Sequence, residues 1–190
     1  EFQYDFKIGL DHELTVGAGY IDESVRADRY EGVRQTSFNT FVFAQEQWRP
    51  NSRFHFIVSA RADNNSDYAA HVSPKLSGLI RPKTWLNIRF SVGNGFKSPD
   101  FRQLYLNFTN PVVGYSVFGT STVEESLRDL SKTGQIKKVL IEPSSEKIKP
   151  EVSNSFNLGI EMQPWSFLSF GANFFRNNVK NLIDSVPIAV

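Results

Sequence analysis

The sequence predicts an all-β chain with antiparallel strands in an up-and-down meander, forming part of a transmembrane β-barrel that carries one long, helix-containing loop. Three observations predict this class. Apolar and polar residues alternate with a period of two through most of the 190 residues. The segments that join the alternating stretches are short and long in turn. The 17 Phe, six Tyr and three Trp are an aromatic surplus that needs apolar surroundings.

Composition excludes several other classes of protein. With 22% charged residues, a formal net charge of +1 and Lys and Arg scattered along the chain, the sequence does not favour nucleic-acid binding. It has no cysteine, and its three histidines, His12, His55 and His71, lack the spacing of metal ligands. No stretch reaches the roughly 18 apolar residues of a transmembrane helix, and no signal peptide is present. We expect no nucleic-acid partner, no metal site and no cofactor.

The alternating segments give about eight strands, each near the length of about 9 to 11 residues that crosses a tilted barrel wall. Residues 2–10 and 14–20 alternate strictly and are expected to pair. In residues 53–63, Phe54, Phe56 and Val58 face one way and charged residues face the other, with Ile57 as an exception. The other expected strands, of which the first and last alternate less strictly, are 36–48, 72–81, 85–96, 153–163 and 166–178.

The connections indicate which kind of β structure this is. LDHE, WRPNS, RPKT and QPWS are short, whereas residues 22–35, 64–71 and 97–152 are long. Tight turns at one end and long loops at the other are typical of outer-membrane barrels. A soluble, lipocalin-like meander barrel has the same alternation with its apolar face turned inward, and this alternative stays open.

Three features favour the membrane barrel. The polar side carries both signs of charge, for example Arg61 and Asp63, as a wet lumen would. Gly17 and Gly19 are also expected on the lumen side. Trp48, Trp85 and Trp165 lie beside the short turns, where an aromatic girdle is expected. The side that bears Phe54, Phe56, Val58, Phe90, Phe156 and Ile160 is then expected to contact outer-membrane lipid.

Two helices are expected inside the long loop. Ser98 as N-cap and Pro99 at the first helical position begin the first, which places Phe101, Leu104 and Tyr105 on one face. In the second, Thr122 and Glu125 are expected to form a capping box and Gly134 to end the helix. Val123, Leu127 and Leu130 share its apolar face.

Four segments, in order along the chain, resemble the TonB-dependent outer-membrane receptors. GNGFKSPDFRQLYLNF (93–108) is similar to the family's G-F-R-A-P-x-F-x-E-L-Y segment, and IKPEVSNSFNLGIEM (148–162) to its L-K-P-E-x-S-x-x-Y-E-x-G strand. VFAQEQWRPNSRFHFIVSARAD (42–63) and VSPKLSGLIRP (72–82) resemble its F-x-Q-x-x-W and V-S-P-K strands. The family's N-terminal plug, its TonB box and the usual terminal aromatic residue are not recognisable. The resemblance therefore implies that residues 1–190 are a piece of a larger receptor barrel.

The resemblance also implies a function and a place for it. A receptor of this kind lies in the bacterial outer membrane and imports a scarce nutrient of the siderophore, haem or cobalamin class, with TonB engaged through a part outside this chain. Residues 97–152 would be an extracellular loop over the lumen mouth. The residues of this loop expected to bind the small-molecule ligand are Arg102, Tyr105, Phe108, Tyr115 and Phe118. No histidine lies between Phe96 and Lys149, which weakens the case for haem.

No catalytic constellation is recognisable, and the protein is not expected to be an enzyme. Glu124 and Glu125 lie in the first turn of a predicted helix, where carboxylates interact favourably with the helix dipole. Gly93 and Gly95 lack the strand-to-helix context of a nucleotide site. Two alternatives to nutrient import keep a barrel. One is an outer-membrane adhesin or structural barrel, and the other is the soluble lipocalin-like binder.

Overall fold

The computed structural model describes residues 1–143 and 148–190, and this part of the chain divides into two compact units. The first, here called the sheet unit, consists of Glu1–Asp22, Phe38–Phe96 and Val152–Lys180. The second, here called the loop unit, consists of Glu23–Ser37, Lys97–Glu151 and Asn181–Val190. None of the helices in the described chain is long and apolar enough to cross a membrane.

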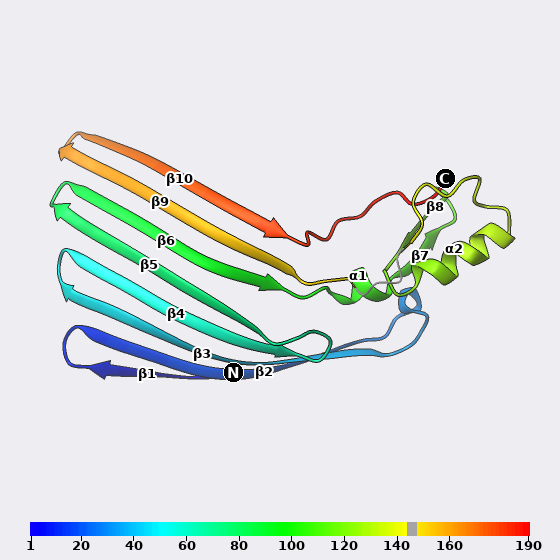
Figure 1. The fold of residues 1–190 in the computed structure, drawn as a ribbon, viewed down its shortest axis with the longest axis horizontal. Helices are drawn as coiled ribbons and strands as arrows, with labels where there is room; N and C mark the ends of the chain where they lie inside the picture. Colours follow the sequence, from blue (N-terminus) through cyan, green and yellow to red (C-terminus); the bar gives the residue numbers. More distant parts are fainter. Residues whose placement is uncertain (144–147) are drawn as a thin grey trace. The chain divides into compact units, whose positions relative to one another are not determined.

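The sheet unit is built on one eight-stranded sheet whose strands pair in the order in which the chain makes them (Figure 1). The strands are β1 (Phe2–Ile8), β2 (His12–Val25), β3 (Gln35–Asn51), β4 (Phe54–Asn65), β5 (His71–Lys83), β6 (Leu86–Lys97), β9 (Glu151–Trp165) and β10 (Leu168–Lys180). The registers of β1–β2, β3–β4, β4–β5, β5–β6 and β9–β10 are antiparallel. The tight turns within β1–β2, β3–β4, β5–β6 and β9–β10 share one end of the strands (Figure 1). The predicted meander and its turn asymmetry are confirmed.

Most strands are longer than expected. β3 has 17 residues and β9 has 15, against the expected length of about 9 to 11. Backbone pairing does not depend on apolar side chains, so the ladder continues where alternation has stopped. In β2 it runs on through Asp22 and Glu23, which sequence analysis assigned to the following loop.

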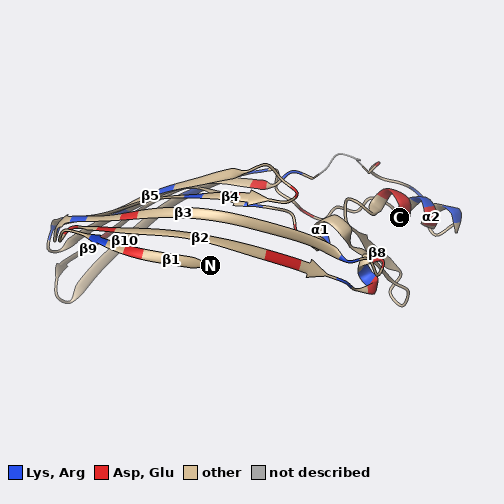
Figure 2. Ribbon diagram, turned by 90° about the horizontal axis from the view of Figure 1, so that it is seen from below, with Lys and Arg blue, Asp and Glu red and all other residues tan. Residues whose placement is uncertain are grey.

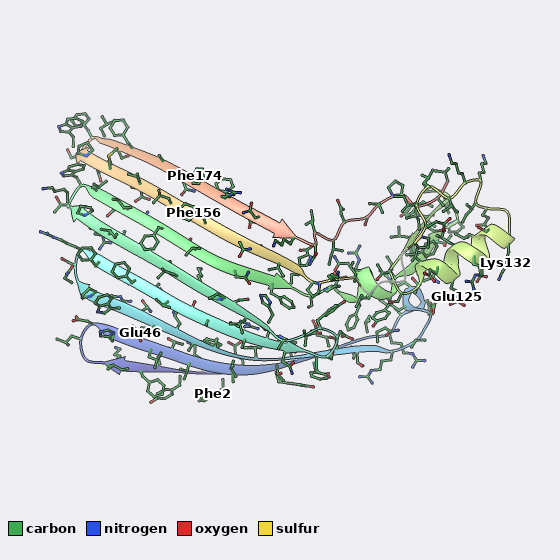
Figure 3. All side chains as sticks on the ribbon, in the orientation of Figure 1. Phe2, Glu46, Glu125, Lys132, Phe156 and Phe174 are labelled. Carbon is green, nitrogen blue, oxygen red and sulfur yellow. The ribbon has the colours of Figure 1, made fainter. Side chains whose placement is uncertain are left out.

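The registers separate the side chains of the sheet into two faces, because cross-strand partners point to the same side and alternate along a strand. Val58 pairs with Leu76, and Leu76 pairs with Val92. We call their side the apolar face. Residues predicted to share this face do share it: Phe54, Phe56, Val58, Phe90, Phe156 and Ile160. Phe156 and Phe174 lie next to each other across β9 and β10, with ring centroids 6.1 Å apart (Figure 3).

The opposite side is the polar face, and it holds charges of both signs. Arg61 pairs with Asp63, and Arg89 with Glu161. Lys75 and Asn157 lie on the same side. The charged residues of the sheet are spread over several strands rather than gathered in a stripe, with one longer acidic stretch on β2 (Figure 2). This arrangement fits a water-filled interior better than a packed core.

The looser alternation of β3 has a physical cause in the neighbouring strand. Phe41 and Phe43 point to the polar face, where they lie over the glycines of β2. A side chain at Gly19 would clash with the Phe41 ring, and one at Gly17 would clash with the Phe43 ring. The two glycines, predicted on the same side as the charged residues, lie on the polar face and make room for two aromatic rings. Phe41 is consequently 5% exposed.

The loop unit has a small core of its own. It contains η1 (Asp28–Tyr30), α1 (Phe101–Tyr105), the hairpin β7 (Asn107–Asn110) and β8 (Tyr115–Phe118), and α2 (Val123–Lys132). Sequence analysis did not expect this hairpin. The buried apolar residues of the loop unit are Tyr30, Leu104, Leu106, Val123 and Leu127. The end of the chain also joins this unit, where Val139 forms a bridge with Ala189.

Helix α1 begins later than predicted. Its N-cap is Asp100, not Ser98, and Phe101 rather than Pro99 is the first helical residue. Asp100 accepts a hydrogen bond from the Gln103 backbone N–H at 2.8 Å, and the Gln103 side chain accepts one from the Asp100 N–H at 2.9 Å. This reciprocal pair satisfies two N–H groups at once, which a cap at Ser98 would not do.

The cap predicted for α2 is also wrong. Thr122 directly precedes the helix, but its hydroxyl donates to the Leu106 carbonyl at 2.7 Å instead of capping α2. The Thr122 hydroxyl, which a capping box would use, therefore makes a tertiary hydrogen bond instead. The predicted stop is confirmed: Gly134 has φ of 72°, and the Gln135 N–H donates to the Leu130 carbonyl as in a Schellman motif.

Candidate functional site

The hairpin of the loop unit ends in an apolar tip whose turn is closed by hydrogen bonds. The Asn110 side-chain oxygen accepts hydrogen bonds from the backbone of Val112 at 3.0 Å and of Val113 at 3.2 Å. Gly114 has φ of 76°, a conformation that glycine adopts at little cost, and its N–H donates to the Asn110 carbonyl. The turn therefore holds two exposed valines in a fixed position.

Two of the five predicted ligand-binding residues come together on one face of this hairpin. Phe108 pairs with Val117, and Tyr115 pairs with Asn110, so all four side chains point to the same side. The Phe108 and Tyr115 rings are 6.1 Å apart and tilted by 60°. They are 40% and 47% exposed, so the pair offers aromatic surface that the unit itself does not cover.

The other three predicted residues lie elsewhere in the loop unit. Phe118 is on the opposite side of the hairpin, because it pairs with Asn107. Tyr105 is at the end of α1, and its ring centroid lies 6.4 Å from that of Phe101. Arg102 is on the exposed surface of α1. The structure thus groups Phe108 with Tyr115 and does not place the remaining three beside them on that face.

Glycine at position 119 fixes the hairpin to α1. A side chain there would meet the Leu104 backbone at 2.5 Å, and the Gly119 N–H donates to the Leu106 carbonyl. Thr120 and Ser121 continue with backbone hydrogen bonds to α1. Only glycine allows this close approach, which holds the aromatic pair on a fixed support.

Residues 22–35 contribute to the loop unit in a way that the sequence pattern does not predict. Tyr30 is 7% exposed within the loop unit, and the Glu31 carboxylate accepts a hydrogen bond from the Asn107 side chain at 2.9 Å. Glu31 has φ of 58°, a conformation uncommon outside glycine. The only signal in the sequence was an aromatic residue followed closely by Gly32 in an otherwise polar loop.

The sheet unit presents a second candidate region on its polar face. Arg61 donates two hydrogen bonds to Asp63 Oδ1 and one to Oδ2, and its guanidinium lies 3.7 Å from the centre of the Phe41 ring. Asn39 donates to the same carboxylate at 3.0 Å. These contacts hold a cation on the polar face in one orientation.

An open hollow of about 640 Å³ lies further along the same face. Its size is that of a small-molecule site. Small and polar side chains form much of its lining: His55, Ser77, Arg89, Ser91, Asn157, Gly159, Glu161, Gly171 and Asn173. In residues 1–143 and 148–190, no group of three or more His, Asp and Glu side chains is arranged to hold a metal ion.

The family model of the TonB-dependent receptor β-barrel matches residues 1–190, the whole chain. The chain belongs to the TonB-dependent receptor family. It is therefore a piece of an outer-membrane receptor barrel, and the family and the fold predicted from its four motifs are confirmed.

Solved structures of other receptors share this fold at low sequence identity. The siderophore receptor PirA of Pseudomonas aeruginosa matches with a TM-score of 0.66 and 18% identity over 93% of this chain and 30% of its own. A mutant of the ferric enterobactin receptor PfeA of the same organism, in complex with enterobactin, matches with a TM-score of 0.66 and 15% identity over 94% of this chain and 26% of its own.

A curated relative has a similar description. The iron-regulated outer membrane virulence protein of Vibrio cholerae serotype O1 is 20% identical over 144 residues, which are 76% of this chain and 18% of the relative. The chain thus spans less than a third of each of these receptors. All three are named for iron, siderophores or the outer membrane, and none is named as an enzyme.

Proposed function

We propose that the receptor to which this chain belongs imports an iron chelate of the siderophore class across the outer membrane, with TonB engaged through a part outside residues 1–190. The observation that carries the proposal is the exposed pair of Phe108 and Tyr115, fixed on a hairpin within the longest connection between strands of the sheet unit. Residues 97–152 would form an extracellular loop, because they leave the strands at the end opposite the tight turns.

The chemistry of the loop unit favours a chelate over haem. Its described residues include no histidine, because His12, His55 and His71 all lie in strands of the sheet. Aromatic rings held with their faces exposed suit a ligand with aromatic groups of its own. The similarity to a siderophore receptor and to a receptor in complex with enterobactin supports the same class.

The remaining predicted residues have supporting roles in this proposal. Arg102 offers a cation to an anionic chelate from the exposed surface of α1, and Tyr105 and Phe118 would line the approach from their own sides of the unit. The apolar face of the sheet would contact outer-membrane lipid, while the polar face and its hollow would line the hydrated lumen.

The test is binding and uptake of ferric enterobactin, with a panel of other ferric siderophores, by the full-length receptor. Phe108→Ala with Tyr115→Ala should weaken binding of the transported chelate about 30-fold, as loss of about 2 kcal/mol of aromatic contact would. Thr109→Ala with Ser116→Ala is the matched control, because this pair lies on the other side of the same hairpin with its hydroxyls 2.8 Å apart. Normal binding by the aromatic double variant, in receptor that is fully assembled, would refute the site.

A further inference from the structure

The apolar face of the sheet carries a hydrogen-bonded pair of a histidine and a glutamate near the tight-turn end. His12, at the start of β2, donates from Nδ1 to Glu46 Oε1 of β3 at 2.7 Å. Glu46 lies opposite Val58, which places it among apolar neighbours (Figure 3 labels Glu46). In the paired stretches of β3 to β6, Glu46 is the only acidic residue on this face. A carboxylate on a lipid-facing side of a barrel wall is more favourable when a polar partner satisfies it.

The hydrogen bond from His12 satisfies only one of the two Glu46 carboxylate oxygens. Among the residues that the structure describes, Oε1 receives one hydrogen bond and Oε2 receives none. The Glu46 side chain is 34% exposed and the His12 side chain 46%. A partner from outside the chain can therefore reach the free oxygen.

Trp48 lies beside the pair of His12 and Glu46. Its ring stacks on His12 with centroids 6.0 Å apart and an angle of 18°, and it is 42% exposed. It lies two residues after Glu46 on the same face of β3. At about 3.3 Å per residue and a tilt of about 45°, the carboxylate lies about 5 Å further than Trp48 from the tight-turn end along the membrane normal. That depth is just below an aromatic girdle, where lipid headgroups meet acyl chains.

We infer that Glu46, His12 and Trp48 bind the headgroup of a zwitterionic phospholipid with a primary ammonium, phosphatidylethanolamine. The inference rests on the proposed lipid contact of the apolar face. The ammonium would donate to Glu46 Oε2 while its charge lies against the Trp48 ring, so that a carboxylate and an aromatic face hold one cation. Apolar neighbours such as Val58 and Phe56 would contact the acyl chains.

Charge and hydrogen-bonding capacity select this headgroup over other phospholipids. Phosphatidylglycerol has a net negative charge and no cation, so the carboxylate would repel it. Phosphatidylcholine has a cation without N–H groups, which can lie against Trp48 but cannot donate to Glu46. Binding should therefore fall from phosphatidylethanolamine to phosphatidylcholine to phosphatidylglycerol.

Native mass spectrometry of the detergent-solubilised full-length receptor, titrated with each of the three lipids, measures this order directly. Glu46→Gln should lower phosphatidylethanolamine binding about tenfold, as loss of a charge-assisted hydrogen bond would, and leave phosphatidylglycerol binding unchanged or stronger. Glu161→Gln is the matched control, because this carboxylate is also paired, with Arg89, but lies on the polar face. It should leave all three affinities as they are.

The outcomes separate this inference from the proposed function. Lipid binding without a preference for phosphatidylethanolamine, or an equal loss in Glu46→Gln and Glu161→Gln, would overturn the headgroup site alone. Absence of any phospholipid binding would overturn the lipid contact of the apolar face. Nutrient uptake is measured separately and does not depend on either result. If Glu46→Gln does not assemble, Trp48→Leu gives the same test, because it removes the aromatic face and leaves the carboxylate in place.

Discussion

Adjacent residues in the middle of β5 test which face of the sheet contacts lipid. Leu76 is the sixth of the 13 residues of β5, lies on the apolar face between Val58 and Val92, and is 38% exposed. No acidic residue is among these cross-strand partners. Ser77 lies on the polar face between Ile57 and Ser91 and borders the hollow, which leaves room for a longer side chain.

The expected costs of placing arginine at these two positions differ greatly. Leu76→Arg puts a cation near the bilayer midplane and should destabilise the barrel by about 2 to 4 kcal/mol. That is a factor of roughly 30 to 700 in the folding equilibrium. Ser77→Arg puts the same cation in water and should cost less than about 1 kcal/mol. Val58 is a poorer choice than Leu76, because an arginine there would lie opposite Glu46 and gain an ion pair.

The assay is urea unfolding of the full-length receptor from phospholipid vesicles, followed by tryptophan fluorescence. The two variants must unfold with the same dependence on urea, so that their midpoints can be compared as free energies. Equal costs at Leu76 and Ser77 would refute the assignment of the faces, and a larger cost at Ser77 would reverse it.

Two further predictions concern close packing in the sheet unit and a hydrogen bond in the loop unit. Gly19→Ala should destabilise the receptor by about 1 to 3 kcal/mol, because the new methyl group would displace the Phe41 ring, whereas Gly171→Ala, with its nearest neighbour 4.0 Å away, should be nearly neutral; thermal unfolding of both variants checks this, and equal stabilities would contradict it. Thr122→Ala should loosen the loop unit by about 1 kcal/mol through loss of its hydrogen bond, and Glu125→Ala should not; hydrogen exchange in α2 distinguishes this expectation from a capping box, which would make both variants equally harmful.

Strand order, turn asymmetry and the division of the faces could be predicted because each depends on local pattern. A period of two fixes which side chains share a face, and the interruption of that period marks each turn. The ends of strands could not be predicted in the same way. Backbone hydrogen bonds extend β2 through Asp22 and Glu23 without any apolar signal.

The candidate site could be predicted only in part, since its geometry depends on contacts between distant segments. Aromatic residues in the long loop were found, but the pairing of Phe108 with Tyr115 requires the register of a hairpin that sequence analysis did not expect. Thr122 stands at the position of a helix cap, yet its hydroxyl donates to the carbonyl of a residue 16 positions earlier in the chain. Tyr30 joins the same unit from a separate loop, and no local pattern indicates such a contact.

Uptake of radioiron by cells that express the full-length receptor, with and without a functional TonB, tests the proposed import most directly. Iron supplied as ferric enterobactin, or as another ferric siderophore of the panel, should accumulate only when both receptor and TonB are present. The receptor that lacks Phe108 and Tyr115 side chains, at equal abundance in the outer membrane, should accumulate much less. Failure to take up any chelate of the panel, or uptake that is the same without TonB, would contradict TonB-dependent import of iron chelates.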